Sequence, residues 1–164
     1  MQDNVFTMLE MQDAMNTRVH PEWRKQGFAW YRAIWTECAE LLDHHGWKWW
    51  KKQAPDMEQV KLELIDIWHF GMSILLVHAD GKTTDELAQE IAAAFDVEAG
   101  SESFLEAVET FACDCLATRG FSTTRFAQVI QAAGMSLDEL YRGYVGKNVL
   151  NFFRQDHGYK DGSY

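Results

Sequence analysis

The sequence predicts an all-α protein, an antiparallel bundle of about six or seven helices. Three observations support this fold class. Apolar residues recur with the 3.6-residue period of amphipathic helices, and no stretch shows the strict alternation of a half-buried strand. Serine or threonine followed three residues later by an acidic residue, a signal of helix starts, separates several of these stretches. The chain has only two prolines, so long helices can run without interruption.

Local start and stop signals place the individual helices. Pro21 and Pro55 stand just before two of them, where proline fits the first turn. Ser136 and Glu139 form a capping-box pattern for the last helix, and Gly134 closes the one before it. The turns are short and no linker is seen, so residues 1–164 are expected to form a single domain. The expected helices cover residues 3–18, 22–44, 56–79, 84–96, 101–118, 123–133 and 136–155.

Composition restricts the function. The chain has 15 basic and 25 acidic residues, a net charge of −10, and this field disfavours nucleic-acid binding. Its longest apolar stretch, residues 67–79, is shorter than the roughly 20 residues that cross a membrane. The N-terminus lacks a secretory signal pattern, so a cytoplasmic location is expected. Cys38, Cys113 and Cys115 are expected to be reduced thiols in packed helices.

Four acidic residues on two neighbouring helices carry the main functional signal. Glu37 and Glu40 lie three residues apart beside an apolar stripe, and Glu63 and Asp66 repeat this spacing on a helix that is apolar almost all round. Buried carboxylates need a compensating partner. Lys61 is the one nearby base and points to another face, so side-chain ion pairs are not expected to balance them. The stripe beside the first pair comprises Tyr31, Ile34, Trp35, Cys38, Leu41 and Leu42.

A turn of about a dozen residues lets the two helices pack antiparallel and bring the four acids together. Converging oxygen donors without Cys or His favour Mg²⁺, with Mn²⁺ as a substitute. Two or more such ions would support hydrolysis of a phosphoanhydride. In this hypothesis Glu40 accepts the proton of the attacking water, and Glu37, Glu63 and Asp66 are ligands.

Other side chains could hold the rest of a nucleotide. Lysines directly after the first acidic pair, and polar residues of the C-terminal tail, are candidate phosphate contacts. Gln12 and Asn16 share a helix stripe and could read a pyrimidine edge, although each alone favours a surface position. The phosphate candidates are Lys48, Lys51, Lys52, Lys147, Asn148, Arg154, Tyr159 and Lys160.

Aromatic residues supply flat surfaces on which a base could stack, but most are expected in the core. The histidines of the buried helix are expected to be core residues, and those near the end of the preceding helix to face solvent. The candidate stacking residues are Trp47, Trp49, Trp50 and Phe70; the two histidine pairs are His69 with His78 and His44 with His45.

Three blocks of the chain, TECAELLDHHGWKWWK, VKLELIDIWHF and YVGKNVLNFFRQDHGYKDGSY, resemble the signature blocks of the dimeric all-helical dUTPases. These enzymes belong to the helical nucleoside-triphosphate pyrophosphatase superfamily with the MazG-type enzymes. The N-terminal EMQDAMN resembles their uracil-contacting helix. The resemblance implies a Mg²⁺-dependent homodimer that hydrolyses dUTP to dUMP and pyrophosphate by attack on the β-phosphorus, with dUDP as a further candidate substrate.

The resemblance also assigns roles to residues of this chain. The carboxylates become metal ligands, with Glu40 placed to activate water. The base-pocket residues become Gln12, Asn16, Trp47 and Phe70, and the phosphate or sugar contacts become Lys48, Lys51, Asn148, Arg154, Tyr159 and Lys160.

Three alternatives stay open at this point. The first is a dCTP or broad-range nucleoside-triphosphate pyrophosphatase, which keeps the chemistry and changes the base. The second is a non-catalytic interaction protein that uses the acidic region 80–114, where ten acids accompany one base. The third is a helical bundle whose acids lie at a dimer seam.

Overall fold

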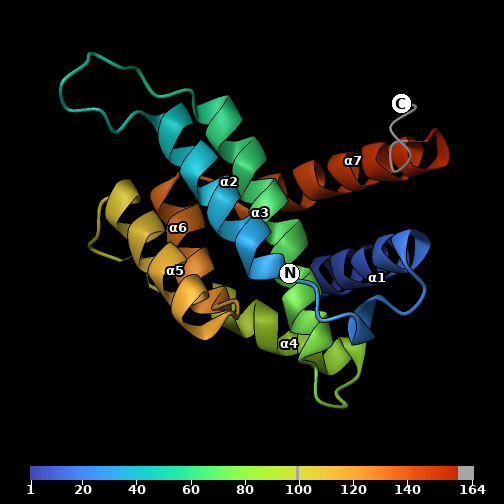
Figure 1. Cartoon of the computed structure of the whole chain (residues 1–164). Helices are drawn as coiled ribbons and strands as arrows, with labels where there is room; N and C mark the ends of the chain where they lie inside the picture. The colour runs from blue at the N-terminus through green and yellow to red at the C-terminus, as the bar shows by residue number, and fades with distance from the viewer. Residues whose placement is uncertain (99, 159–164) are drawn as a thin grey trace.

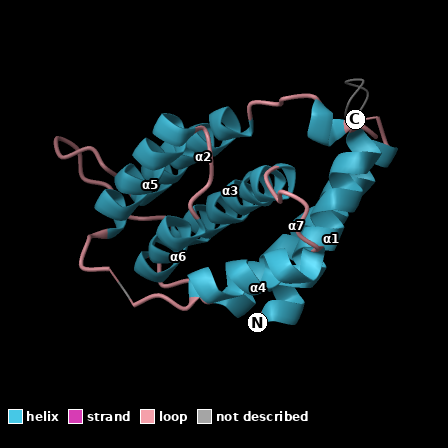
Figure 2. Ribbon diagram, turned by 90° about the horizontal axis from the view of Figure 1, so that it is seen from below, coloured by secondary structure: helices cyan, strands magenta, loops and turns pink. Residues whose placement is uncertain are grey.

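The computed structural model describes residues 1–98 and 100–158, which fold into seven α-helices and one 3₁₀ turn without a strand (Figure 2). The predicted all-α class is confirmed. None of the helices in these residues is long and apolar enough to cross a membrane. The elements are α1 (Gln2–Val19), η1 (Trp23–Lys25), α2 (Trp30–His45), α3 (Met57–Val77), α4 (Thr84–Phe95), α5 (Phe104–Thr118), α6 (Thr123–Ala132) and α7 (Leu137–Asp156).

Helix α3 lies at the centre of the fold (Figures 1 and 2). Its most extensive contact is with α2, and α1 and α7, which also contact each other, pack against it as well. Helices α5 and α6 form a pair beside α2, and α4 joins α1 to α6. The loop of residues 46–56 extends beyond the helices in Figure 1 and returns the chain so that α2 and α3 run antiparallel. A hydrogen bond of 2.9 Å from the Asp56 amide to the His44 carbonyl ties its ends together.

The single helix expected over residues 22–44 is wrong. The chain forms the short turn η1, reverses over residues 26–29 and begins α2 at Trp30. Gly27 permits the reversal because its φ of +64° lies in the left-handed region that favours glycine. Edge-to-face contacts of Trp30 with Trp23 and with Phe28, at 6.2 and 5.6 Å, fix the turn against the start of α2.

Other helix boundaries agree with the local signals. Ser136 and Glu139 form the expected capping box at the start of α7, and Gly134 adopts φ +66° after α6. Asp56 caps α3 by accepting a hydrogen bond from the Gln59 amide. The observed helices begin or end within three residues of the expected ranges, apart from the break before α2.

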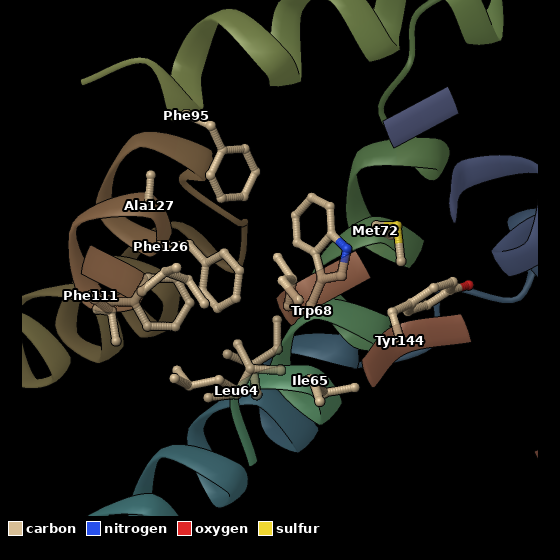
Figure 3. Close-up of a cluster of buried hydrophobic side chains, with 14 of the residues drawn as sticks. Leu64, Ile65, Trp68, Met72, Phe95, Phe111, Phe126, Ala127 and Tyr144 are labelled. Atoms are coloured by element: carbon tan, nitrogen blue, oxygen red, sulfur yellow. The ribbon is translucent and has the colours of Figure 1, made fainter. Parts of the chain in front are cut away.

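An aromatic cluster anchors α3 to the α4–α6 side of the fold (Figure 3). Trp68 stacks on Phe126 with ring centres 5.5 Å apart and meets Phe95 edge-to-face at the same distance. One turn further along α3, Gly71 allows the Phe121 ring to approach closely, because a Cβ there would overlap the ring. This packing holds α3 rigidly, and α3 carries half of the predicted acidic group.

Several surface and core assignments were wrong. The tryptophans of the 46–56 loop are exposed rather than part of the core, and Trp35 leaves the predicted stripe of α2 with 45% of its surface exposed. Cys113 is exposed, whereas the other two thiols are buried and all three are free. His78 lies exposed at the end of α3. These residues lie in a loop, at a helix end or on the solvent side of a helix, where single exposed apolar residues are common in folded proteins.

Candidate active site

Three of the four predicted carboxylates converge between α2 and α3. Glu37, Glu63 and Asp66 each offer an oxygen, and these atoms lie within 4.8 Å of one another. The spacing of three residues places Glu63 and Asp66 one turn apart on the same face of α3, and the antiparallel packing brings α2 to that face. Glu63 is buried, while Glu37 and Asp66 are half-buried. The arrangement concentrates negative charge in a poorly solvated space.

The electrostatics of the group show an excess of negative charge. Burial, followed by repulsion from Asp66, Glu40 and Glu63, raises the pKa of Glu37 from 4.5 to about 7. The pKa of Glu63 is also raised, first by burial and then by Asp66 and Glu40. Near neutral pH, Glu37 therefore retains a proton in part of the molecules and shares a hydrogen bond with Glu63.

Two side chains relieve part of this repulsion, although ion pairs were not expected to balance the four acids. Lys147 of α7 places its Nζ 2.9 Å from Oδ2 of Asp66, and His44 places its Nε2 3.3 Å from Oε1 of Glu63. His44 is half-buried here, not solvent-facing as expected. Lys61 pairs with Glu139 at 2.7 Å instead, so it does face away from the acids.

Glu40 lies at the edge of the group rather than within it. It is exposed, one turn of α2 beyond Glu37, and no oxygen of it belongs to the set within 4.8 Å. Its charge still raises the pKa of both Glu37 and Glu63. Its carboxylate thus stands beside the three convergent acids with access to solvent.

A cavity of about 250 Å³ opens next to these acids and includes Asp66 in its wall. Helix α1 supplies Gln12 and Asn16, and α3 supplies His69 and Phe70. Trp30 forms an aromatic wall with Phe70, with ring centres 6.2 Å apart. The remaining lining residues are Met15, Val19, His20, Trp23, Phe28, Asn151 and Gln155.

A buried hydrogen-bond network orders this cavity. Gln12 donates from Nε2 to Asn16 Oδ1 at 3.0 Å and to Ser73 Oγ at 3.2 Å. Its Oε1 accepts from the Tyr144 hydroxyl at 3.0 Å. Asn148 of α7 donates to the same hydroxyl at 3.1 Å. Gln12 and Asn16 are both buried, so the surface position that each alone favoured is wrong.

His69 presents a defined tautomer to the cavity. Gln12 Oε1 can only accept, and it lies 3.0 Å from His69 Nδ1, so this nitrogen carries the proton. Burial, with a smaller contribution from Lys147, lowers the His69 pKa to about 3, which keeps the ring neutral. Its Nε2 therefore carries a lone pair, and this buried atom has no partner among the described residues. An orphaned acceptor on a cavity-lining residue indicates a ligand that donates a hydrogen bond.

The aromatic contribution to this cavity differs from the expected one. Trp47 lies in the 46–56 loop, donates to Asp43 at 2.8 Å and does not line the cavity, whereas Trp30 does. Trp30 was not among the predicted base-pocket residues; the helix expected over residues 22–44 includes it. The site role of His69 was not predicted either, although this residue follows Asp66 by three positions on the same helix face.

The phosphate candidates occupy varied positions. Lys48 pairs with Asp43 at 3.4 Å, and Lys51 is exposed on the same loop. Asn148 is buried within the network, so its amide supports Tyr144. Arg154 is half-buried, and its Nε has no partner among the described residues. Tyr159 and Lys160 lie outside the residues that the structure describes.

Comparison with known proteins identifies a relationship over nearly the whole chain. A family model described as dUTPase matches residues 4–159. A search of curated proteins found no match. The matched range contains the convergent carboxylates, the adjacent cavity and the buried network that joins α1, α3 and α7.

Proposed function

We propose that this chain, which belongs to the dUTPase family, hydrolyses dUTP to dUMP and pyrophosphate with Mg²⁺ held by its convergent carboxylates. Membership of the family establishes the protein as a dUTP diphosphatase. The observation that carries the metal dependence is the approach of Glu37, Glu63 and Asp66 to within 4.8 Å of one another.

The donor set fits a hard divalent cation. All three groups are carboxylates, and Mg²⁺ or Mn²⁺ prefers such oxygen ligands. The raised pKa of Glu37 and Glu63 supports the same assignment, because an added cation would relieve the repulsion that causes it. When bound, two or more such ions would supply Lewis acidity for the phosphoanhydride and a nucleophilic water at neutral pH.

Glu40 is the proposed proton acceptor for the attacking water. It stands one turn beyond Glu37, outside the tight group, with its carboxylate open to solvent. Glu40 can therefore act as a further metal ligand or accept a proton. The second role requires a carboxylate oxygen that is not already engaged by neighbouring groups. Lys147, bound to Asp66, lies where it can contact substrate phosphate once that carboxylate binds a cation.

The adjacent cavity is the proposed base site. Trp30 and Phe70 provide aromatic walls, and His69 Nε2 provides an acceptor. An acceptor that meets ring N3 favours uracil, which carries a hydrogen there, over cytosine, which carries a lone pair. Gln12 uses both amide hydrogens and its oxygen within the network, so we assign it to positioning His69. Asn16 donates one amide hydrogen to Ser73 and keeps the other for a base carbonyl.

A homodimer is proposed from the resemblance of the signature blocks. Trp35 of α2 and Leu62 of α3 are 45% and 43% exposed, which leaves apolar surface on the two helices that carry the acids. A second copy would cover such surface. Light scattering after gel filtration, compared between wild type and a Trp35→Glu variant, tests this assignment.

Release of pyrophosphate from dUTP, dCTP, dTTP and UTP, and of inorganic phosphate from dUDP, tests the substrate and the metal together. We expect turnover of dUTP with Mg²⁺, none with a chelator, and loss of activity in Glu63→Gln. Glu109→Gln on the exposed face of α5 is the matched control and should keep wild-type activity. Preference for dCTP would refute the base assignment, and turnover in the presence of chelator would refute the metal assignment.

A further inference from the structure

We infer that a second cavity, separate from the carboxylates, binds a small aromatic anion of the nucleoside monophosphate class. This cavity of about 430 Å³ lies where η1 and the start of α2 meet the end of α3. Small-molecule sites typically enclose about 300–1,000 Å³. It shares Trp23, Phe28 and Trp30 with the base cavity, but none of the convergent carboxylates lines it.

The charge of this cavity is opposite to that of the protein. Three arginines line it, and among the described residues no carboxylate does, although the net charge of the chain is −10. Arg24 is neutralised by Asp13 at 3.1 Å. Arg32 and Arg119 form no ion pair with a described residue, and both lie 5.7 Å from the centre of the Tyr31 ring. Two guanidinium groups beside one ring give the cavity positive charge that no described carboxylate neutralises, which favours binding of an anion.

The backbone adds to this positive potential at two points. Helix α2 begins at the cavity with no side-chain cap at Ala29 and no acidic residue in its first turn, whereas α3 to α7 all have capping side chains. The dipole of α2 favours an anion there. Arg119 ends α5 in the left-handed region at φ +53°, a position where glycine is usual, although Gly120 follows it directly. The strained backbone orients an arginine, rather than the glycine, at the cavity.

The aromatic walls favour a ligand with a ring. Trp30 is held edge-to-face against both Trp23 and Phe28, so the cavity has fixed aromatic surfaces. A ring that stacks there, joined to a phosphate that reaches Arg32 and Arg119, matches both features. The acidic surface elsewhere disfavours a long polyanion, and the cavity is larger than the base cavity, so a purine mononucleotide fits best.

Calorimetric titration with dGMP in a chelator tests the inference. The chelator removes any binding through divalent ions, and no hydrolysis is measured, so the result is independent of the proposed function. We expect saturable binding whose Kd rises at least about tenfold in an Arg32→Gln/Arg119→Gln double variant, since each guanidinium supplies a charge-assisted hydrogen bond. Arg142→Gln, an exposed arginine paired with Asp138, should leave the Kd unchanged. Both cavity arginines are exposed, and thermal unfolding will verify that the double variant is folded.

A further variant and a second ligand distinguish this cavity from the base cavity and from a site for phosphate alone. Asn151→Ala changes only the base cavity, so it should leave dGMP binding intact. Loss of binding in that variant would place dGMP in the base cavity and overturn the inference. Inorganic phosphate should bind at least about tenfold more weakly than dGMP, because it has no ring to stack. Equal binding of phosphate, absence of dGMP binding, or no effect of the double variant would each overturn it.

Discussion

Removal of the Glu37 charge should stabilise the metal-free protein while it disrupts the proposed metal site. The pKa of Glu37 rises from 4.5 to about 7 on folding, with burial as the largest cause. A raised acid pKa means that the folded state holds its proton more tightly than the unfolded state. The free energy of unfolding therefore falls as the pH rises from 4.5 to about 7 and is level above that. Glutamine does not ionise, so the free energy of unfolding of Glu37→Gln does not fall in this way as the pH rises.

The size of the effect follows from the pKa difference. At about 1.36 kcal/mol per pKa unit, a rise from 4.5 to about 7 corresponds to about 3.4 kcal/mol. Solvent reaches part of the Glu37 carboxyl and screens the repulsion, so we expect about half of this value. For a chain of this length, about 1.7 kcal/mol raises Tm by about 3–7 °C.

Thermal unfolding with a chelator at pH 5 and pH 8 measures this effect. Glu37→Gln should unfold about 3–7 °C above wild type at pH 8 and close to wild type at pH 5. Glu109→Gln should follow wild type at both pH values. Addition of Mg²⁺ should stabilise wild type more than Glu37→Gln, because a ligand of the native state raises stability by mass action. A Glu37→Gln variant that is less stable than wild type at pH 8 in chelator would show that burial and repulsion do not destabilise the charged Glu37 carboxylate.

Three further substitutions test the site and the core. Glu40→Gln should lower kcat for dUTP by about 10²–10⁴-fold with an unchanged Tm, because the residue is exposed and is the proposed proton acceptor; a kcat close to wild type would reject this role. Tyr144→Phe removes a hydroxyl that donates to Gln12, so the free energy of unfolding should fall by about 1–2 kcal/mol in denaturant titration and KM should rise more than kcat falls. Gly71→Ala should lower the free energy of unfolding by about 1–3 kcal/mol, because its Cβ would overlap the Phe121 ring; an unchanged midpoint of unfolding would show that the ring moves without cost.

The fold could be predicted because its determinants are local. Helical periodicity and capping signals such as Ser136 with Glu139 report the conformation of a few neighbouring residues. The break at residues 26–29 was missed because Gly27 alone lowers helix propensity without requiring a turn. The break is fixed by the packing of Trp30 against Trp23 and Phe28, and this packing is a tertiary contact that local propensity does not report.

The acidic group was visible in the sequence for a similar reason. The two acidic pairs each have a spacing of three residues and lie on helices joined by a single loop. Antiparallel packing of these helices therefore brings the pairs close together. The Lys147 to Asp66 contact spans 81 positions and depends on how α7 crosses α3, which no local pattern reports. Trp30 lines the cavity and Trp47 does not, and this difference depends on the tertiary course of the loop, which no local pattern reports.

The position of Asp66 links base recognition to the chemistry of the acids. It belongs to the convergent carboxylates and also lines the proposed base cavity. His69 and Phe70 follow it by three and four residues, so about one helical turn of α3, with a rise of about 1.5 Å per residue, separates the proposed metal ligand from the proposed base-binding residues. If the base of a nucleotide contacts His69 and Phe70, its phosphates therefore lie a short distance along α3 from the acids. Since Trp68 and Gly71 lock this same turn into the aromatic core, the two functions share one rigid element, and a substitution that shifts α3 should impair both together.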